Sequence, residues 1–152
     1  MQKCEKNNML DDKYFMQKAL AEAILAAEKG EVPIGCVIVC NDTIIAKAHN
    51  LTQTLQDVTA HAEMQAFTSA SNYLGAKYLK DCTLYVTLEP CPMCAGAAAW
   101  TQISKIVYGA KDEKLAHINK QQLFHPKTQI IGGILEDECK NLLKNFFANK
   151  RK

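Results

Sequence analysis

The chain has very little arginine, only one of its 18 basic residues, in a total length of 152 residues. Glycine and proline are also scarce, at 7 and 4 residues, which excludes low-complexity linkers. The 18 basic residues face 16 acidic ones, and a net charge of +2 excludes a nucleic-acid binder of the basic-tail type. Scarce arginine also argues against dense bidentate recognition of phosphate or guanine, because lysine contributes mainly a flexible point charge.

Long apolar runs are missing as well. No segment approaches the roughly 20 apolar residues of a membrane helix, and the first residues lack the apolar core of a signal peptide. We therefore expect no membrane association and a cytoplasmic location. The hydrophobic fraction of 48% at this length predicts one domain over residues 1–152, and the order of residues 1–11 is left open. In a reducing compartment the seven cysteines are expected to be thiols or metal ligands, not a disulfide framework.

Helical and strand patterns alternate along the chain, which predicts an α/β fold with helices on both faces of one mixed sheet. The segment 110–127 is polar and lacks a clean period, so we expect a loop with one short helix there. A hairpin is expected at residues 41–42. The helices are expected at 14–29, 60–74, 92–101 and 136–149, and the strands at 34–39, 43–48, 82–88, 103–108 and 129–131.

Two short sequences carry the chemistry: TAHAE at residues 59–63 and PCPMC at residues 90–94. Cys91 and Cys94, at the start of a predicted helix, lie about one turn apart on one face, so both thiolates can bind one ion. With His61 they make three ligands, and a catalytic zinc keeps its fourth position for water. We therefore expect one Zn²⁺ per chain.

A structural site would need a fourth protein ligand, and the sequence offers only weak candidates. Cys82 opens a predicted strand that separates it from Cys91 by roughly 20 Å, at about 3.3 Å per residue. His49 is not excluded by distance, although its spacing does not favour it. Three ligands and one water molecule is the better interpretation.

Glu63 follows His61 by two residues, close to the expected ion without being needed as a ligand. A carboxylate there can take a proton from zinc-activated water and return it to a leaving nitrogen. Taken separately, the His-Ala-Glu sequence reads as ordinary helix surface, and the Cys-x-x-Cys pair as a redox pair or half a zinc knuckle. Together they are typical of zinc-dependent nucleobase deaminases.

Over nearly its whole length the chain resembles the bacterial tRNA-specific adenosine deaminases. The resemblance rests on EVPIG, HN, TAHAE, LYVTLEPCPMCAGA, GAKD and GILEDEC, found at residues 31–35, 49–50, 59–63, 84–97, 109–112 and 133–139. It implies a three-layer α/β/α, cytidine-deaminase-like fold with a mixed five-stranded sheet. It also implies hydrolytic deamination of the wobble adenosine of a tRNA anticodon to inosine, by a homodimer acting on the anticodon stem-loop.

The resemblance assigns roles to single residues. It implies that His61, Cys91 and Cys94 hold the zinc and that Glu63 carries the proton. Asn50 would hydrogen-bond the flipped base, for which an amide offers both a donor and an acceptor; a turn or cap after a strand is the other interpretation. The remaining substrate contacts would come from Ala62, Asp112, Phe146 and Phe147.

The outer contacts have competing explanations. Asp112 also reads as a surface residue, and Phe146 and Phe147 as part of the apolar face of the last helix, with Leu142 and Leu143. Basic residues gather beside these phenylalanines and would follow phosphates or simply be solvated. They are Lys144, Lys150, Arg151 and Lys152.

The chain departs from the family after GAKD, where EKLAHI at residues 113–118 replaces a segment with glycine and small residues. In the family this region borders the substrate. A free-base deaminase of the guanine or cytosine type is therefore a second hypothesis, since it would use the same zinc ligands. A non-catalytic zinc or redox module is a third, but it leaves His61 and Glu63 without a role.

Overall fold

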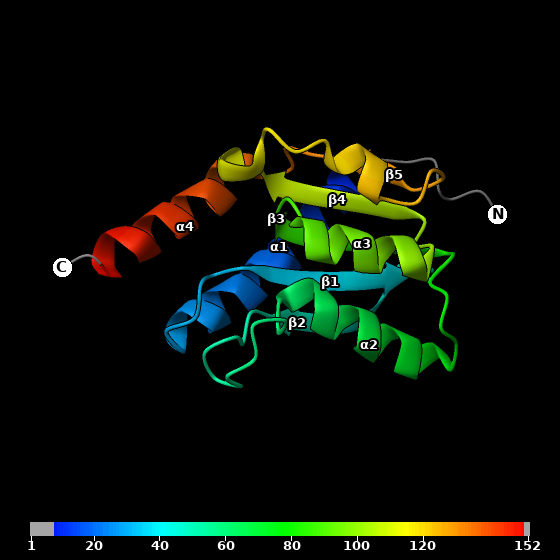
Figure 1. Ribbon diagram of the computed structural model, residues 1–152, viewed down its shortest axis with the longest axis horizontal. Helices are drawn as coiled ribbons and strands as arrows, with labels where there is room; N and C mark the ends of the chain where they lie inside the picture. Colours follow the sequence, from blue (N-terminus) through cyan, green and yellow to red (C-terminus); the bar gives the residue numbers. More distant parts are fainter. Residues whose placement is uncertain (1–7, 151–152) are drawn as a thin grey trace.

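Five strands form one sheet at the centre of the computed structural model, which describes residues 8–150, with the backbone alone for 8–11 (Figure 1). The question whether residues 1–11 are ordered therefore concerns residues that lie mostly outside the described part of the chain. The strand order is β2-β1-β3-β4-β5. The strands are β1 (Gly35–Cys40), β2 (Thr43–His49), β3 (Cys82–Leu88), β4 (Lys105–Ala110) and β5 (Gln129–Ile131).

The sheet is mixed. β1 runs antiparallel to β2 and β3, whereas β3, β4 and β5 are parallel. A hairpin joins β1 and β2 through Asn41 and Asp42, whose φ angles of 53° and 61° are those of a tight two-residue turn. The expected hairpin is confirmed.

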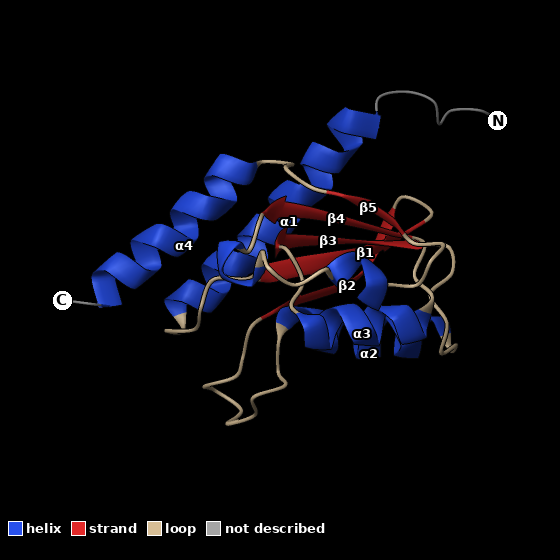
Figure 2. Ribbon diagram, turned by 45° about the horizontal axis from the view of Figure 1, so that its top comes forward, coloured by secondary structure: helices blue, strands red, loops and turns tan. Residues whose placement is uncertain are grey.

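Helices cover both faces of the sheet (Figure 2). On β1 the buried side chains alternate: Cys36 and Ile38 pack in one core with α2 and α3, and Val37 and Val39 in the other with α1. The helices are α1 (Asn8–Glu28), α2 (Ala62–Leu74), α3 (Pro92–Thr101) and α4 (Glu136–Lys150). The expected α/β/α layers around a mixed five-stranded sheet are therefore confirmed. None of the described helices is long and apolar enough to cross a bilayer.

Gly35 lets α1 lie directly on β1. A Cβ atom at this position would collide with the backbone of Ala19 and Ala23. The helix therefore packs directly on the main chain of β1. This contact holds the start of β1 in place, where Gly35 pairs with His49 at the end of β2.

Several boundaries differ from those expected. The first helix begins at Asn8, six residues before the expected start at residue 14. The fourth strand begins at Lys105, not at residue 103, because Gln102 in the left-handed conformation (φ 58°) ends α3 and places Ile103 in the following turn. Residues 110–127 contain two short 3-10 helices where one was expected, η2 (Glu113–Leu115) and η3 (Lys120–Leu123).

The last helix was expected to use Leu142, Leu143, Phe146 and Phe147 as an apolar face. In the structure Cys139 is its only buried residue, and Phe147 is 39% exposed. The helix leaves the sheet after its first turns and projects away from the fold (Figure 1). Its far end therefore has few neighbours to bury these side chains.

Candidate metal centre and active site

The sequence places two of the expected metal ligands at helix starts. His61 is the N-cap residue of α2 and Cys91 that of α3, and both have extended backbone conformations. Cys94 lies in the first turn of α3, after Pro92, which opens the helix without needing an amide donor. Because the two helices cover the same face of the sheet, their starts bring the three side chains together.

The donor atoms of these residues have the spacing of a metal site. The Nδ1 atom of His61 lies 3.6 Å from Sγ of Cys91 and 3.5 Å from Sγ of Cys94. All three donor atoms lie within 4.8 Å of one another. Tetrahedral zinc, with bonds of about 2.3 Å to sulfur and about 2.0 Å to nitrogen, separates such donors by about 3.5 Å. The expected ligand set is thus brought together, and its dimensions fit Zn²⁺.

The surroundings of Cys91, but not those of Cys94, favour the thiolate in the absence of a metal. A hydrogen bond from the Cys94 thiol, aided by the main-chain N–H groups of Cys94 and Met93, lowers the pKa of Cys91 to about 5 despite burial. The same bond and burial raise the pKa of Cys94. Thiolate is the form of cysteine that binds metals, so Cys91 is ready to do so at neutral pH.

Neither alternative fourth ligand reaches this cluster. Within residues 8–150 the metal-binding group contains only the three predicted side chains. The His49 ring is already engaged, because its Nδ1 donates to Oε1 of Glu22 at 2.8 Å and its Nε2 accepts from Nζ of Lys29 at 3.0 Å. A three-residue protein ligand set agrees with the sequence prediction.

Glu63 lies in the first turn of α2, beside the three donors, and only 4% of it is exposed. Burial raises the pKa of its carboxyl group to about 7, in part opposed by its own main-chain N–H and by a hydrogen bond with Cys94. A carboxyl group with a pKa near 7 can both accept and donate a proton at neutral pH. The structure therefore places a buried carboxyl group beside the three donor atoms, and its role as a proton carrier stays a prediction.

Asn50 follows β2 directly and is 6% exposed. Its main-chain N–H binds the oxygen of Ile34 at 3.0 Å, but its side-chain amide has no hydrogen-bond partner among the described residues. A side-chain cap would engage that amide, so among the described residues the amide is left available for another partner. The methyl group of Ala62 is fully buried in the core, so only its main chain can face a substrate.

Sequence reasoning missed Gln65, which joins the end of β2 to the start of α2. Its Nε2 atom donates to the main-chain oxygens of His49 at 2.8 Å and Ala60 at 3.2 Å. These residues precede Asn50 and His61, so one side chain links the segments that carry the two residues. Its position one turn after His61 was the available signal.

Glu31 was also missed as a functional support, although it lies in a motif of the resemblance. It is fully buried, and its carboxylate accepts hydrogen bonds from the main chain of Gln53 (3.2 Å) and from N and Oγ1 of Thr54 (2.6 and 2.7 Å). Burial raises the pKa of Glu31, but these bonds outweigh it and hold the pKa below its usual value. Glu31 thereby anchors the loop that leads to His61.

The expected outer contacts lie on two neighbouring segments. The Asp112 side chain caps η2 by accepting from the N–H of Lys114 at 3.2 Å, and Nζ of Lys114 lies 6.0 Å from the ring centre of Phe147. Phe147 packs edge-on against Phe146, with ring centres 5.4 Å apart. The segment after β4 and the end of α4 therefore form one surface.

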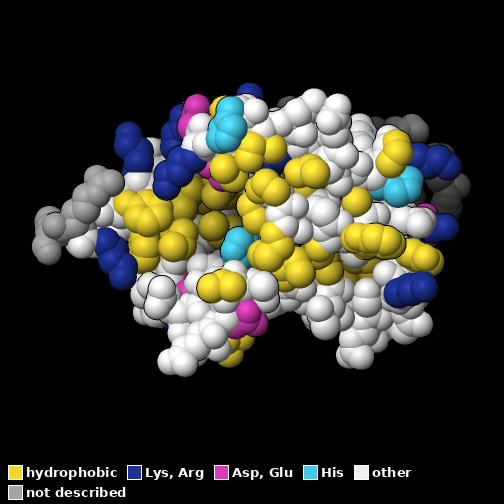
Figure 3. Space-filling model, in the orientation of Figure 1, with side chains coloured by type: hydrophobic (Ala, Val, Ile, Leu, Met, Phe, Trp, Pro, Cys, Tyr) yellow, Lys and Arg dark blue, Asp and Glu magenta, His cyan; other side chains and the backbone are white. Residues whose placement is uncertain are grey.

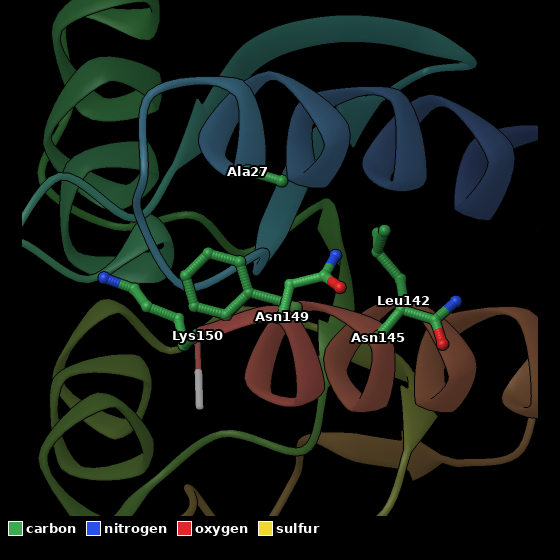
Figure 4. A pocket seen from close by; sticks show the side chains of 6 residues that line it. Ala27, Leu142, Asn145, Asn149 and Lys150 are labelled. Carbon is green, nitrogen blue, oxygen red and sulfur yellow. The ribbon is translucent and has the colours of Figure 1, made fainter. Parts of the chain in front are cut away.

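A groove separates α4 from α1. It has a volume of about 410 Å³ and is lined by Ala27 on one side and by Leu142, Asn145, Asn149 and Lys150 of α4 on the other (Figure 4). Phe146 also lines it, which explains why Phe146 is less exposed than Phe147. Arg151 and Lys152, expected to extend the basic end, lie outside the described residues.

Comparison with known proteins identifies the family. A family model described as MafB19-like deaminase matches residues 10–151. The tRNA-specific adenosine deaminase of Bacillus subtilis (strain 168) is 46% identical over 150 residues, which cover 95% of this chain and 93% of that protein. The chain belongs to the tRNA-specific adenosine deaminases. The resemblance read from the sequence is thereby confirmed.

Solved structures of this and a neighbouring family have the same fold. A structure from a study of A-to-I editing by tRNA:A34 deaminases at the wobble position matches with a TM-score of 0.80 and 39% identity, covering 86% of this chain and 99% of the other. The guanine deaminase of Bacillus subtilis matches with a TM-score of 0.64 and 39% identity, over 69% and 68% of the two chains. The tRNA deaminase is thus matched over more of its length.

Proposed function

We propose that this chain hydrolyses the wobble adenosine of a tRNA anticodon to inosine and ammonia. The single observation that carries the chemistry is the buried carboxyl group of Glu63 beside three donors with zinc spacing. Membership of the tRNA-specific adenosine deaminases supports the substrate.

His61, Cys91 and Cys94 would hold one Zn²⁺ per chain. A zinc ion held there supplies a Lewis acid that lowers the pKa of water to near 7. Glu63 accepts the proton of the attacking water and delivers it to the departing amino nitrogen, for which a pKa of about 7 suits both transfers. The adenine C6–N bond breaks, a C6–O bond forms, and the amino group leaves as ammonia.

Asn50 and Ala62 would hold the base. The side-chain amide of Asn50, which has no hydrogen-bond partner among the described residues, offers a donor and an acceptor to the purine edge. Ala62 would contribute its main chain, since its methyl group packs in the core. Unstacking a base costs least in a loop that already exposes it, which suits an anticodon.

The neighbouring nucleotides would meet Asp112, Lys114, Phe146 and Phe147. An exposed aromatic ring beside an ammonium group fits a base that stacks next to a phosphate. Lys144, Lys150, Arg151 and Lys152 would extend this contact to the RNA backbone.

The face over α3 would bind a second copy of the chain. Apolar side chains gather there (Figure 3), among them Trp100, which is 83% exposed, and Met93, which is 37% exposed. Exposed apolar patches of this kind mark interaction sites, and the resemblance implies a homodimer. A cytoplasmic location follows from the proposed tRNA substrate.

Deamination of free guanine is the second candidate, favoured by the match to the guanine deaminase of Bacillus subtilis. The two functions separate in one experiment. Purified protein is incubated with an adenosine-34 anticodon stem-loop and, separately, with guanine, and the products are measured by mass spectrometry. Inosine at position 34 supports the first proposal; xanthine without inosine overturns it. A stem-loop with guanosine at position 34 is the control.

A further inference from the structure

Lys120, the first residue of η3, is a buried lysine that the mechanism above does not use. Only 5% of it is exposed, and its Nζ lies 3.4 Å from Oε2 of Glu89. It has no hydrogen-bond partner within residues 8–150. Burying an ammonium group is costly unless a charge compensates it, so its contact with Glu89 is its main electrostatic compensation.

Glu89 joins three segments of the chain. It follows β3 and precedes Cys91 by two residues, and its main-chain N–H binds the oxygen of Ala110 at 2.9 Å. Its Oε1 accepts the main-chain N–H of Asp112 at 3.0 Å, while Oε2 faces Lys120. One carboxylate therefore connects the Cys91 loop, the segment after β4, and η3.

The segment 111–119 has few other attachments. None of its residues is buried, and η2 within it buries no side chain. Beyond it, Lys120 is buried and Phe124 packs in the core, while η3 contacts α3. Lys120 is thus the first buried residue after Ala110.

We propose that Lys120 is a positioning residue which, through Glu89, holds the segment 111–119 against the Cys91 loop and so sets the affinity for RNA. The inference rests on the proposed tRNA substrate, because Asp112 and Lys114 of this segment border it. Without Lys120 the Glu89 carboxylate loses its ion pair, and we expect it to turn toward the water of the adjoining cavity of about 430 Å³, which weakens its bond to the N–H of Asp112.

The test is a double-mutant cycle of Lys120→Met and Glu89→Gln, with kinetics on the anticodon stem-loop. Lys120→Met is expected to raise KM about tenfold, with kcat within about twofold of the parent and zinc content unchanged. In the Glu89→Gln background the same change is expected to have little further effect, because no buried charge is left unpaired. Lys127→Met, which removes an exposed charge nearby, controls for simple loss of positive charge.

Each other outcome overturns the proposal. Equal effects of Lys120→Met in both backgrounds would show that Lys120 contacts RNA itself. A fall in kcat with unchanged KM, or loss of zinc, would assign it to general stability of the metal centre.

A second measurement needs no substrate. Amide hydrogen exchange of residues 112–119 is expected to accelerate in Lys120→Met, not in Lys127→Met, and to return toward the parent rate in the double variant. If the exchange rates of residues 112–119 are unchanged in Lys120→Met, the proposal that Lys120 holds this segment is overturned. If the parent protein does not deaminate the stem-loop, the proposed substrate fails, and hydrogen exchange still decides the role of Lys120.

Discussion

The Nε2 atom of Gln65 lies 2.8 Å from the main-chain oxygen of His49 and so connects α2 to the end of β2. The residue after His49 is Asn50, and the helix that carries Gln65 starts at the metal ligand His61. One side chain therefore links the segment that carries Asn50 to the helix that begins at His61.

We predict that Gln65→Leu destabilises the protein by about 1–3 kcal/mol, because it leaves the oxygens of His49 and Ala60 without their donor. Urea denaturation measures the loss. Thr68→Val, on an exposed turn of the same helix, is the control and should stay within about 0.5 kcal/mol of the parent. Equal stability of the Gln65 and Thr68 variants would show that the hydrogen bonds of Gln65 do not contribute to the free energy of unfolding.

Metal content is the second prediction. The purified protein should contain one zinc per chain, and changing both Cys91 and Cys94 to serine should abolish it, because hydroxyl groups do not replace thiolates as ligands. Elemental analysis checks both statements. Cys40→Ser, outside the cluster, should retain full zinc. Zinc retained without Cys91 and Cys94 would refute the ligand assignment.

Glu63→Gln should retain zinc and lose most activity. A proton carrier contributes roughly a hundred- to ten-thousand-fold to turnover, and the amide can no longer accept the proton. Single-turnover rates on the stem-loop measure the effect, with Asp42→Asn, in the exposed turn between β1 and β2, as the control. A Glu63 variant that deaminates at the parent rate would remove Glu63 from the mechanism.

The stability that Glu31 gives to the loop at Gln53 and Thr54 should depend on pH. Its pKa is lowered on folding, so its stabilisation is fully present above the unfolded value of about 4.5 and declines as pH falls through the folded value. Glu31→Gln should destabilise the protein at pH 7 by about 1.5–3 kcal/mol, the range for hydrogen bonds to charged groups, and this difference should shrink below pH 4.5. Thermal unfolding of both proteins across this pH range tests the sign. A constant difference would contradict it.

The basic end predicts a salt effect on tRNA binding. Replacing Lys144, Lys150, Arg151 and Lys152 with glutamine should flatten the dependence of log affinity on log salt by about 3, at about 0.7 per phosphate contact. Fluorescence anisotropy across a salt series measures the slope. The matched control replaces four exposed lysines elsewhere: Lys13, Lys47, Lys77 and Lys80. An unchanged slope in the first variant would move the phosphate contacts to Lys111, Lys114 or other surfaces.

The metal centre was predictable because its information is local. The spacing of Cys91 and Cys94, the proline between them and the turn after His61 determine both the helix starts and the ligand positions. The strand β1 was equally predictable, because a strand that is buried on both faces appears in the sequence as a short run of β-branched and apolar residues. Lys120 was not, since a lysine in a polar segment reads as exposed and its burial depends on Glu89, which lies far away in the sequence. The exposure of Phe147 was also not predictable from the sequence. An apolar face on a helix does not indicate whether the whole length of the helix packs against the sheet.

The two halves of α4 differ in their contacts with the rest of the protein. Its attachment to the fold is made by its first turns, around Cys139, while residues 142–150 bury no side chain. Exchanging that outer half between relatives would thus change what the surface meets without touching the sheet or the metal ligands. For protein engineering, the outer half of α4 can therefore be exchanged while the sheet and the cluster of His61, Cys91 and Cys94 stay unchanged.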